Sequence, residues 1–168
     1  MTSIVWATQP PAQKAVSVED FRLLYDRDYP RVAAYCYQLV RDRDLAADLA
    51  QEAFARLFAR WVTVREPTAY VFHIATNLVR SSWSARARDR ALMPVLASRE
   101  DHPAVDHSVR DAVERLPARY RELVLLHYYA DLTVPDVARA VRRPEGTAKR
   151  MLSEARALLA STLEDSRA

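Results

Sequence analysis

Residues 142–150 read RRPEGTAKR and contain Gly146, the only glycine among 168 residues. Glycine supplies the positive φ angles that tight hairpins, strand bulges and phosphate-binding loops usually need. A chain with one glycine has little means of building them, so we predict an all-α fold. After Gly146 the apolar residues recur at helical spacing and predict a helix whose other face is basic. The apolar positions are Ala148, Met151, Leu152, Ala155, Leu158, Leu159 and Leu163.

The composition permits one ordinary domain or two small ones, because half of the residues are hydrophobic. The formal net charge is +3, the pI is about 9.2, and 23 of the 25 basic residues are arginine. Arginine favours bidentate contacts with phosphates and bases, but a GC-rich genome produces the same bias. Both explanations of the arginine content stay open.

Several classes of protein are disfavoured by what the chain contains. Cys36 has no partner for a disulfide or a thiolate cluster, and we expect it in the core. No stretch approaches ~18 consecutive apolar residues, so we expect a cytoplasmic protein without membrane insertion. Without a nucleophile beside a base or a glycine-rich phosphate loop, we expect neither an enzyme nor a cofactor. The histidines show no shared metal-ligand spacing: they are His73, His102, His107 and His127.

In the first part of the chain, residues 1–16 read as a flexible leader and three helices follow. Ser17 can cap the first helix together with Asp20, and Pro30 is expected to restart or kink it. The second helix begins near Asp44, and the third at Pro67. The inward positions of the second helix and the loop after it are Leu45, Leu49, Ala53, Phe54, Leu57, Phe58 and Trp61.

Residues 93–107 are acidic and contain two prolines, which indicates a flexible linker between two small helical domains. We expect the second domain at residues 108–168, with four helices. Thr133 caps a short helix, and a turn from Arg142 to Pro144 leads into the long basic helix. A short helix, a turn and a longer basic helix make a helix-turn-helix, in which the second helix enters the DNA major groove.

Three motifs, in this order, resemble the extracytoplasmic-function group of bacterial sigma factors. Residues 48–54 read DLAQEAF, residues 74–77 read IATN, and the pair Leu116-Pro117 is followed by PEGTAK at residues 144–149. The resemblance covers about residues 18–165. It implies that residues 17–92 bind core RNA polymerase and help to melt promoter DNA, and that the helix-turn-helix domain reads the minus-thirty-five element. It further implies a protein that is not itself a catalyst and an anti-sigma factor as a partner.

The resemblance assigns polymerase binding to the second helix, through Asp48, Gln51 and Glu52. The periodicity by itself favours a solvated face, because Glu52 and Arg56 make a helix-stabilising i,i+4 pair.

The expected DNA-binding residues fall in three groups. The loop residues Thr63 and Arg65 could hold an extruded base or could belong to a plain connector, whereas Trp61 is expected in the core. On the third helix an amide and a nearby arginine suit bases and phosphates, and the basic run after them suits phosphates. On the last helix the basic N-terminal end suits the major groove. The helical candidates are Asn77, Arg80, Arg86 and Arg88 on the third helix, and Thr147, Lys149 and Arg150 on the last.

The chain departs from the family pattern at Ser81, Arg142 and Met151. Ser81 stands where an aspartate is frequent, Arg142 where glycine is frequent, and Met151 where a basic residue is frequent. An arginine in place of this glycine is expected to strain or reshape the corner unless it tolerates left-handed backbone geometry. These departures leave room for a sigma-like decoy that binds an anti-sigma factor without driving transcription. A helix-turn-helix repressor is a further alternative.

Overall fold

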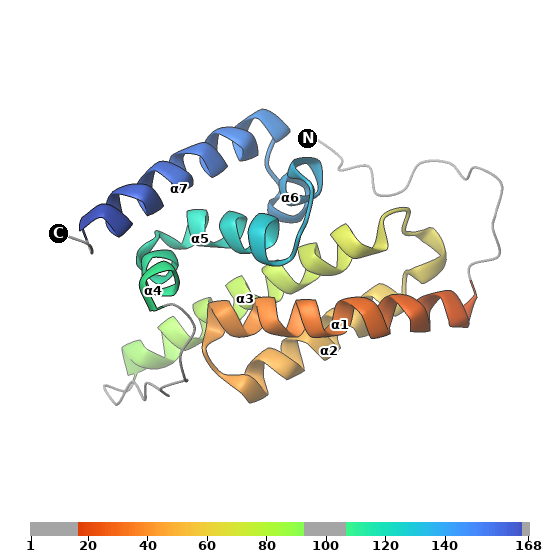
Figure 1. The fold of residues 1–168 in the computed structure, drawn as a ribbon. Helices are drawn as coiled ribbons and strands as arrows, with labels where there is room; N and C mark the ends of the chain where they lie inside the picture. The colour runs from red at the N-terminus through yellow and green to blue at the C-terminus, as the bar shows by residue number, and fades with distance from the viewer. Residues whose placement is uncertain (1–16, 93–106, 166–168) are drawn as a thin grey trace. The chain divides into compact units, whose positions relative to one another are not determined.

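The computed structural model describes residues 17–92 and 107–165, and every regular element in these ranges is helical (Figure 1). This confirms the predicted all-α fold. The expected leader, residues 1–16, and nearly all of the expected linker lie outside the described residues. The chain forms two compact units, residues 1–79 and 80–168, and each is described by itself.

The first unit is built from α1 (Val18–Val40), α2 (Arg43–Phe58), the short 3-10 helix η1 (Trp61–Thr63) and the first half of α3 (Pro67–Leu92). Figure 1 shows α1 and α2 side by side, joined by a two-residue turn. Large apolar side chains of all three α-helices are fully buried and form the core. They include Val32, Tyr35, Phe54, Leu57, Phe72 and Val79.

The predicted caps of the first unit are present. Ser17 accepts a hydrogen bond from the backbone of Asp20, whose carboxylate accepts one in return from the Ser17 amide, both between atoms 3.0–3.1 Å apart. This reciprocal pair is a capping box, which satisfies two of the amides that a helix leaves without partners. The second helix starts one residue earlier than predicted, because Asp42 caps it through the amide of Leu45.

Pro30 does not restart α1, and that part of the prediction is wrong. The helix runs unbroken from Val18 to Val40 with Pro30 inside it. Proline removes one helical hydrogen bond and crowds the preceding turn. Here Asp28 and Val32 on either side are fully buried, so tertiary contacts hold both halves of the helix in place.

The second unit contains α4 (His107–Arg115), α5 (Ala118–Val124), η2 (Leu125–Tyr129), α6 (Val134–Val141) and α7 (Glu145–Asp165). The four predicted α-helices are present, and η2 extends α5 by a turn of π-helix that the sequence pattern did not predict. The hydroxyl of Thr133 caps α6, as expected. Part of the core lies between α4, α5 and α7, where Leu116, Val124 and Ala155 meet.

Two residues assigned to the inward stripes are exposed instead. Phe58, the last residue of α2, is 51% exposed, and Leu158 on α7 is 41% exposed. Helical spacing correctly gives the direction in which these side chains point. Phe58 is the last residue of α2, and its ring packs edge-to-face with Phe21, 4.8 Å away between ring centres.

The turns of the described chain use left-handed backbone without glycine. Arg41, Asp131 and Arg142 have φ angles of 56°, 53° and 56°, whereas Gly146 lies within the first turn of α7 and has no positive φ. Of the outcomes left open for Arg142, the structure shows the left-handed one, and this residue closes α6. A Cβ added at Gly146 would meet no atom within 4 Å, so the fold itself does not require glycine there.

We predict that Arg142→Gly stabilises the second unit by about 0.5–1 kcal/mol. Left-handed geometry costs a residue with a Cβ roughly 1–2 kcal/mol, and glycine removes this cost from the folded state. Glycine also gives the unfolded chain more freedom, which offsets about 0.4–1 kcal/mol of the stabilisation. Equilibrium chemical unfolding followed by circular dichroism measures the difference. Arg143→Gly is the matched control, because Arg143 has no positive φ; it should destabilise. Equal effects of the two substitutions would contradict the assignment of strain to Arg142.

Candidate polymerase and nucleic-acid interfaces

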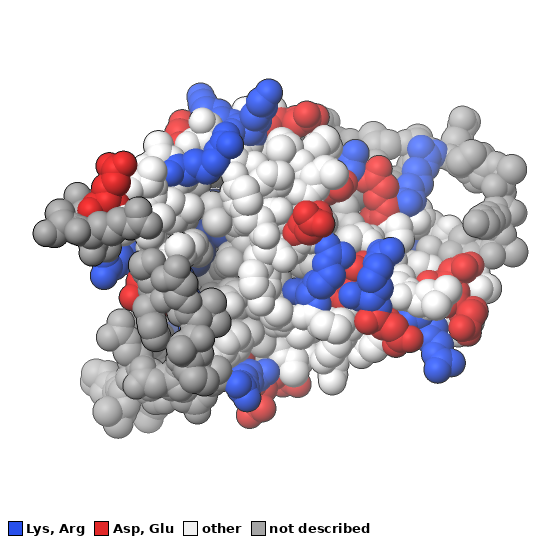
Figure 2. Space-filling model, viewed as in Figure 1, with Lys and Arg blue, Asp and Glu red and all other residues white. Residues whose placement is uncertain are grey.

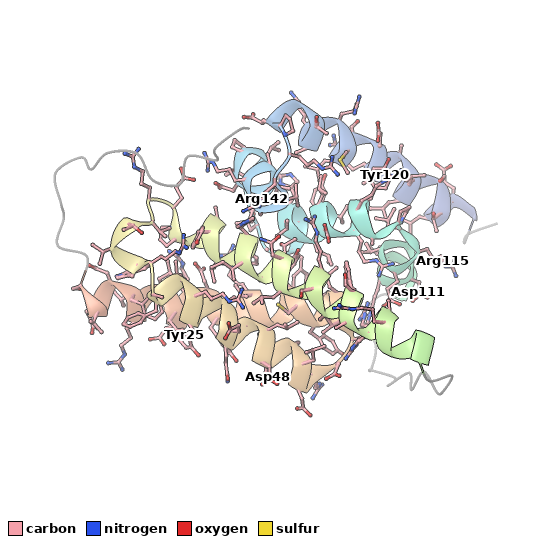
Figure 3. All side chains as sticks on the ribbon, turned by 180° about the vertical axis from the view of Figure 1, so that it is seen from behind. Tyr25, Asp48, Asp111, Arg115, Tyr120 and Arg142 are labelled. Atoms are coloured by element: carbon pink, nitrogen blue, oxygen red, sulfur yellow. The ribbon has the colours of Figure 1, made fainter. Side chains whose placement is uncertain are left out.

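One face of α2 carries the three residues predicted to meet polymerase. Asp48, Gln51 and Glu52 are all exposed, while the opposite face of the helix is buried in the core. Figure 3 labels Asp48 on this helix. Glu52 accepts a hydrogen bond of 2.7 Å from the Nε of Arg56, as the i,i+4 spacing predicts. The face thus offers two carboxylates and an amide, of which one carboxylate is already paired.

Charges of both signs alternate on the face that Figure 2 presents, where blue and red side chains lie in mixed groups. A large field of one sign is not visible on that face.

The loop between α2 and α3 buries its tryptophan and exposes its other side chains. Trp61 is 8% exposed, and its indole Nε1 donates to the carbonyl oxygen of Ser17 over 3.2 Å. The expectation that Trp61 belongs to the core is confirmed. Thr63 and Arg65 are exposed, and the Thr63 hydroxyl donates to the carbonyl of Arg60 over 2.9 Å.

A buried carboxylate in α1 was missed by the sequence analysis. Asp28 is fully buried and accepts hydrogen bonds from Arg27, Arg31 and Thr68, which together form the Asp28 cluster. Burial opposes ionisation of this carboxyl, but the hydrogen bonds from Arg27, Thr68 and Arg31 outweigh it and hold its pKa below the usual value. Asp28 follows Leu24 by four residues and precedes Val32 by four. A carboxylate inside an apolar i,i+4 stripe was the signal that could have revealed it.

On α3 the predicted promoter-facing residues already have contacts within the protein. The Asn77 amide nitrogen lies 3.0 Å from Nε2 of His73, and Asn77 is itself exposed. Arg80, the first residue of the second unit, makes a bidentate ion pair of 2.9 and 2.5 Å with Glu122, which is 3% exposed. A phosphate bound at Arg80 would therefore share the guanidinium with Glu122 or compete with it.

The basic run after Arg80 continues along α3. Arg88 is exposed, and its Nε donates to the carbonyl of Ser84 over 3.3 Å, whereas Arg86 is half-buried. Ser81, one of the departures from the family pattern, is exposed.

The start of α7 presents cations above a sealed core. Lys149 and Arg150 are exposed and Thr147 is half-buried, while Ala148 and Met151 are buried. This explains the methionine where the family often has a basic residue: the position points into the core of this protein. The exposed cation stands one residue earlier, about 100° around the helix.

Arg150 has an ordered neighbour that the sequence did not reveal. Its Nε lies 3.7 Å from a carboxylate oxygen of Glu154, and the other oxygen of Glu154 accepts a 2.8 Å hydrogen bond from the hydroxyl of Tyr120. Figure 3 labels Tyr120, which belongs to α5. The guanidinium of Arg119 lies over the Tyr120 ring, 4.8 Å from its centre.

Three further features of the described residues bear on the class of protein. In residues 17–92 and 107–165, no group of three or more His, Cys, Asp or Glu side chains could hold a metal ion. Cys36 is buried, and this burial raises the pKa of its thiol to about 12. In the same part of the chain, no helix has both the length and the apolar character needed to cross a membrane.

Comparison with known proteins identifies the class of protein. Residues 24–89 match Sigma-70 region 2, and residues 106–159 match Sigma-70, region 4. The RNA polymerase sigma-E factor of Streptomyces antibioticus is 30% identical over 134 residues, which cover 75% of this chain and 74% of that protein. RNA polymerase sigma factor SigV of Bacillus subtilis is 23% identical over 142 residues, covering 80% of this chain and 84% of SigV.

Among solved structures, the sigma factor RpoE in complex with the anti-sigma factor NepR, from Bartonella quintana, is similar with a TM-score of 0.75. It shares 25% identity and covers 88% of this chain and 98% of its own. The chain belongs to the sigma-70 family and to its extracytoplasmic-function group. It is a sigma factor, a subunit that binds core RNA polymerase and directs it to promoters, and the resemblance seen in three sequence motifs is confirmed.

Proposed function

We propose that this sigma factor uses three surfaces, each of which binds a different target. The face of Asp48, Gln51 and Glu52 on α2 binds core polymerase. The loop with Thr63 and Arg65, together with α3, contacts the separated strand of the minus-ten element. The start of α7 reads the minus-thirty-five element, and the observation that carries this assignment is the pair of exposed cations above the buried Ala148 and Met151.

We further propose the domain boundaries that follow from this division: the region 2 domain at residues 17–92, a linker at 93–107, and the region 4 domain at 108–168. The protein acts by binding, without catalysis of its own, and works in the cytoplasm where polymerase is. An anti-sigma factor is proposed as its regulator. The support is the similar Bartonella sigma factor, which was solved in complex with an anti-sigma factor.

Run-off transcription tests the proposed function directly. Purified protein is added to core polymerase with a library of genomic promoter fragments, and transcripts that require the protein are sequenced. A sigma factor yields transcripts that start downstream of a shared pair of elements. A decoy binds an anti-sigma factor but yields no dependent transcript, and a repressor lowers transcription from its own site.

We predict that Asn77→Ala leaves the closed promoter complex intact but reduces strand opening by roughly tenfold. A good base contact is worth about 1–3 kcal/mol, and each 1.4 kcal/mol changes an equilibrium tenfold. Permanganate footprinting of unpaired thymines measures opening, and a mobility shift measures closed binding. Ser84→Ala, an exposed change on the same helix, is the control. A footprint of parental strength for Asn77→Ala would show that Asn77 does not contact the opened strand.

A further inference from the structure

The loop between η1 and α3 is held at both of its ends by the same helix. At one end the indole of Trp61 donates to the carbonyl of Ser17, the residue that caps α1. At the other end the hydroxyl of Thr68 donates to Asp28 over 2.8 Å. Ser17 and Asp28 are eleven positions apart, about 16 Å along a helix that rises 1.5 Å per residue. Residues 62–66 therefore span two fixed points on α1.

Each carboxylate oxygen of Asp28 accepts two hydrogen bonds, and one of the four comes from Thr68. One carboxylate oxygen, Oδ1, accepts from Arg27 Nε at 3.0 Å and from Arg31 Nη1 at 2.6 Å. The other, Oδ2, accepts from Arg27 Nη2 at 2.7 Å and from Thr68 at 2.8 Å. Arg27 also donates to the Thr68 hydroxyl over 2.7 Å. Thr68 thus accepts from one group and donates to another, which fixes its rotamer and with it the first turn of α3.

A buried carboxylate is an unusual way to join two helices. Between Leu24 and Val32 an apolar side chain would continue the stripe, and well-packed apolar residues often equal or exceed a buried ion pair in stability. The Asp28 cluster adds specificity of position. Its hydrogen bonds are satisfied in only one register of α3 against α1, whereas apolar contacts tolerate small shifts.

We infer that Asp28 is a positioning residue for capture of the promoter strand. Acting through Thr68, it holds the loop of residues 62–66 in the shape that presents Thr63 and Arg65 to an extruded base. This inference rests on the proposed function. If the loop is already ordered in the free protein, binding does not carry the entropy cost of ordering it, and the base is therefore captured more readily.

The test uses two substitutions at Thr68 that differ in one hydroxyl. Thr68→Val keeps the shape of the side chain and removes the donor to Asp28, whereas Thr68→Ser keeps the donor. Hydrogen exchange of the free protein reports the loop itself. We expect Thr68→Val to accelerate exchange of the amides of residues 62–66 by about tenfold, and Thr68→Ser to leave them as in the parent. Amides of α2 serve as the internal reference for global unfolding.

The second measurement uses the holoenzyme with promoter DNA obtained from the run-off experiment. 2-Aminopurine replaces single minus-ten bases, and its fluorescence rises when that base leaves the stack. We expect Thr68→Val to lower the rate of this rise about tenfold without changing closed-complex affinity, and Thr68→Ser to restore it. Asp28→Asn, which retains the shape but loses the charge, should act in the same direction as Thr68→Val.

The two measurements separate the possible failures. Loop exchange that is unchanged in Thr68→Val would overturn the anchoring role of the Asp28 cluster. Faster loop exchange with an unchanged rate of base extrusion would overturn the inference. The Asp28 cluster would then anchor the loop, but this anchoring would not contribute to capture of the base. If the parent protein supports no transcription, the proposed function fails, and hydrogen exchange still decides whether Asp28 anchors the loop.

Discussion

We expect replacement of both Lys149 and Arg150 by alanine to lower promoter affinity by roughly 10- to 100-fold. Both side chains are exposed at the start of α7, and the buried residues between them and the core are unaffected by the change. A base contact contributes about 1–3 kcal/mol, and each phosphate contact adds about one unit to the slope of log affinity against log salt. A titration of the holoenzyme with promoter DNA at several salt concentrations measures both quantities.

The salt dependence shows what each cation does. A lost phosphate contact makes the slope shallower by about one unit, whereas a lost base contact relaxes the sequence preference at one position. Arg156→Ala is the matched control, since Arg156 is an exposed arginine farther along the same helix. Core polymerase binding should survive the double substitution. Parental promoter binding and transcription by the double variant would show that the start of α7 is a solvent-exposed surface and does not read the minus-thirty-five element.

We expect reversal of Asp48 and Glu52 to lysine to weaken binding to core polymerase by roughly 100-fold or more. Two carboxylates on one exposed face become two cations, and like charges brought together in an interface cost several kcal/mol. Each 1.4 kcal/mol corresponds to a tenfold change in affinity. Fluorescence anisotropy of a labelled protein titrated with core polymerase gives the dissociation constant.

The control for this reversal is Asp26→Lys, an exposed carboxylate on α1. Circular dichroism should show that all variants keep their helical content, because the Glu52 to Arg56 pair contributes only about 0.2–0.5 kcal/mol. A folded double variant with parental affinity would move the polymerase-binding surface away from this face of α2.

The features that sequence analysis predicted well are those determined by neighbours in the chain. Ser17 and Thr133 cap their helices through the backbone amides of residues three positions ahead. The spacing of apolar residues predicts which face of each helix is buried. The Asp28 cluster was not predictable in the same way. Its partner Thr68 is forty residues away, so the reason for a carboxylate in an apolar stripe becomes visible only after folding.

The same distinction applies to the candidate site. Periodicity placed Lys149 and Arg150 on the exposed face of α7, and the structure agrees. It could not predict that Tyr120, from another helix, would hold Glu154 beside Arg150. Nor could it predict that Arg80 would be paired with Glu122, because both contacts depend on how separate helices pack.

Burial of Cys36 has a consequence for how the protein can be studied and how it can respond to oxidants. With a thiol pKa of about 12, only about one molecule in 10⁵ carries the reactive thiolate at pH 7. The sequence has no other cysteine, so its thiol chemistry is poorly suited to direct reaction with an oxidant. In the laboratory, a cysteine introduced at exposed Ser153 would be the single reactive thiol, and a fluorophore or crosslinker could be attached beside the α7 surface without replacing Cys36.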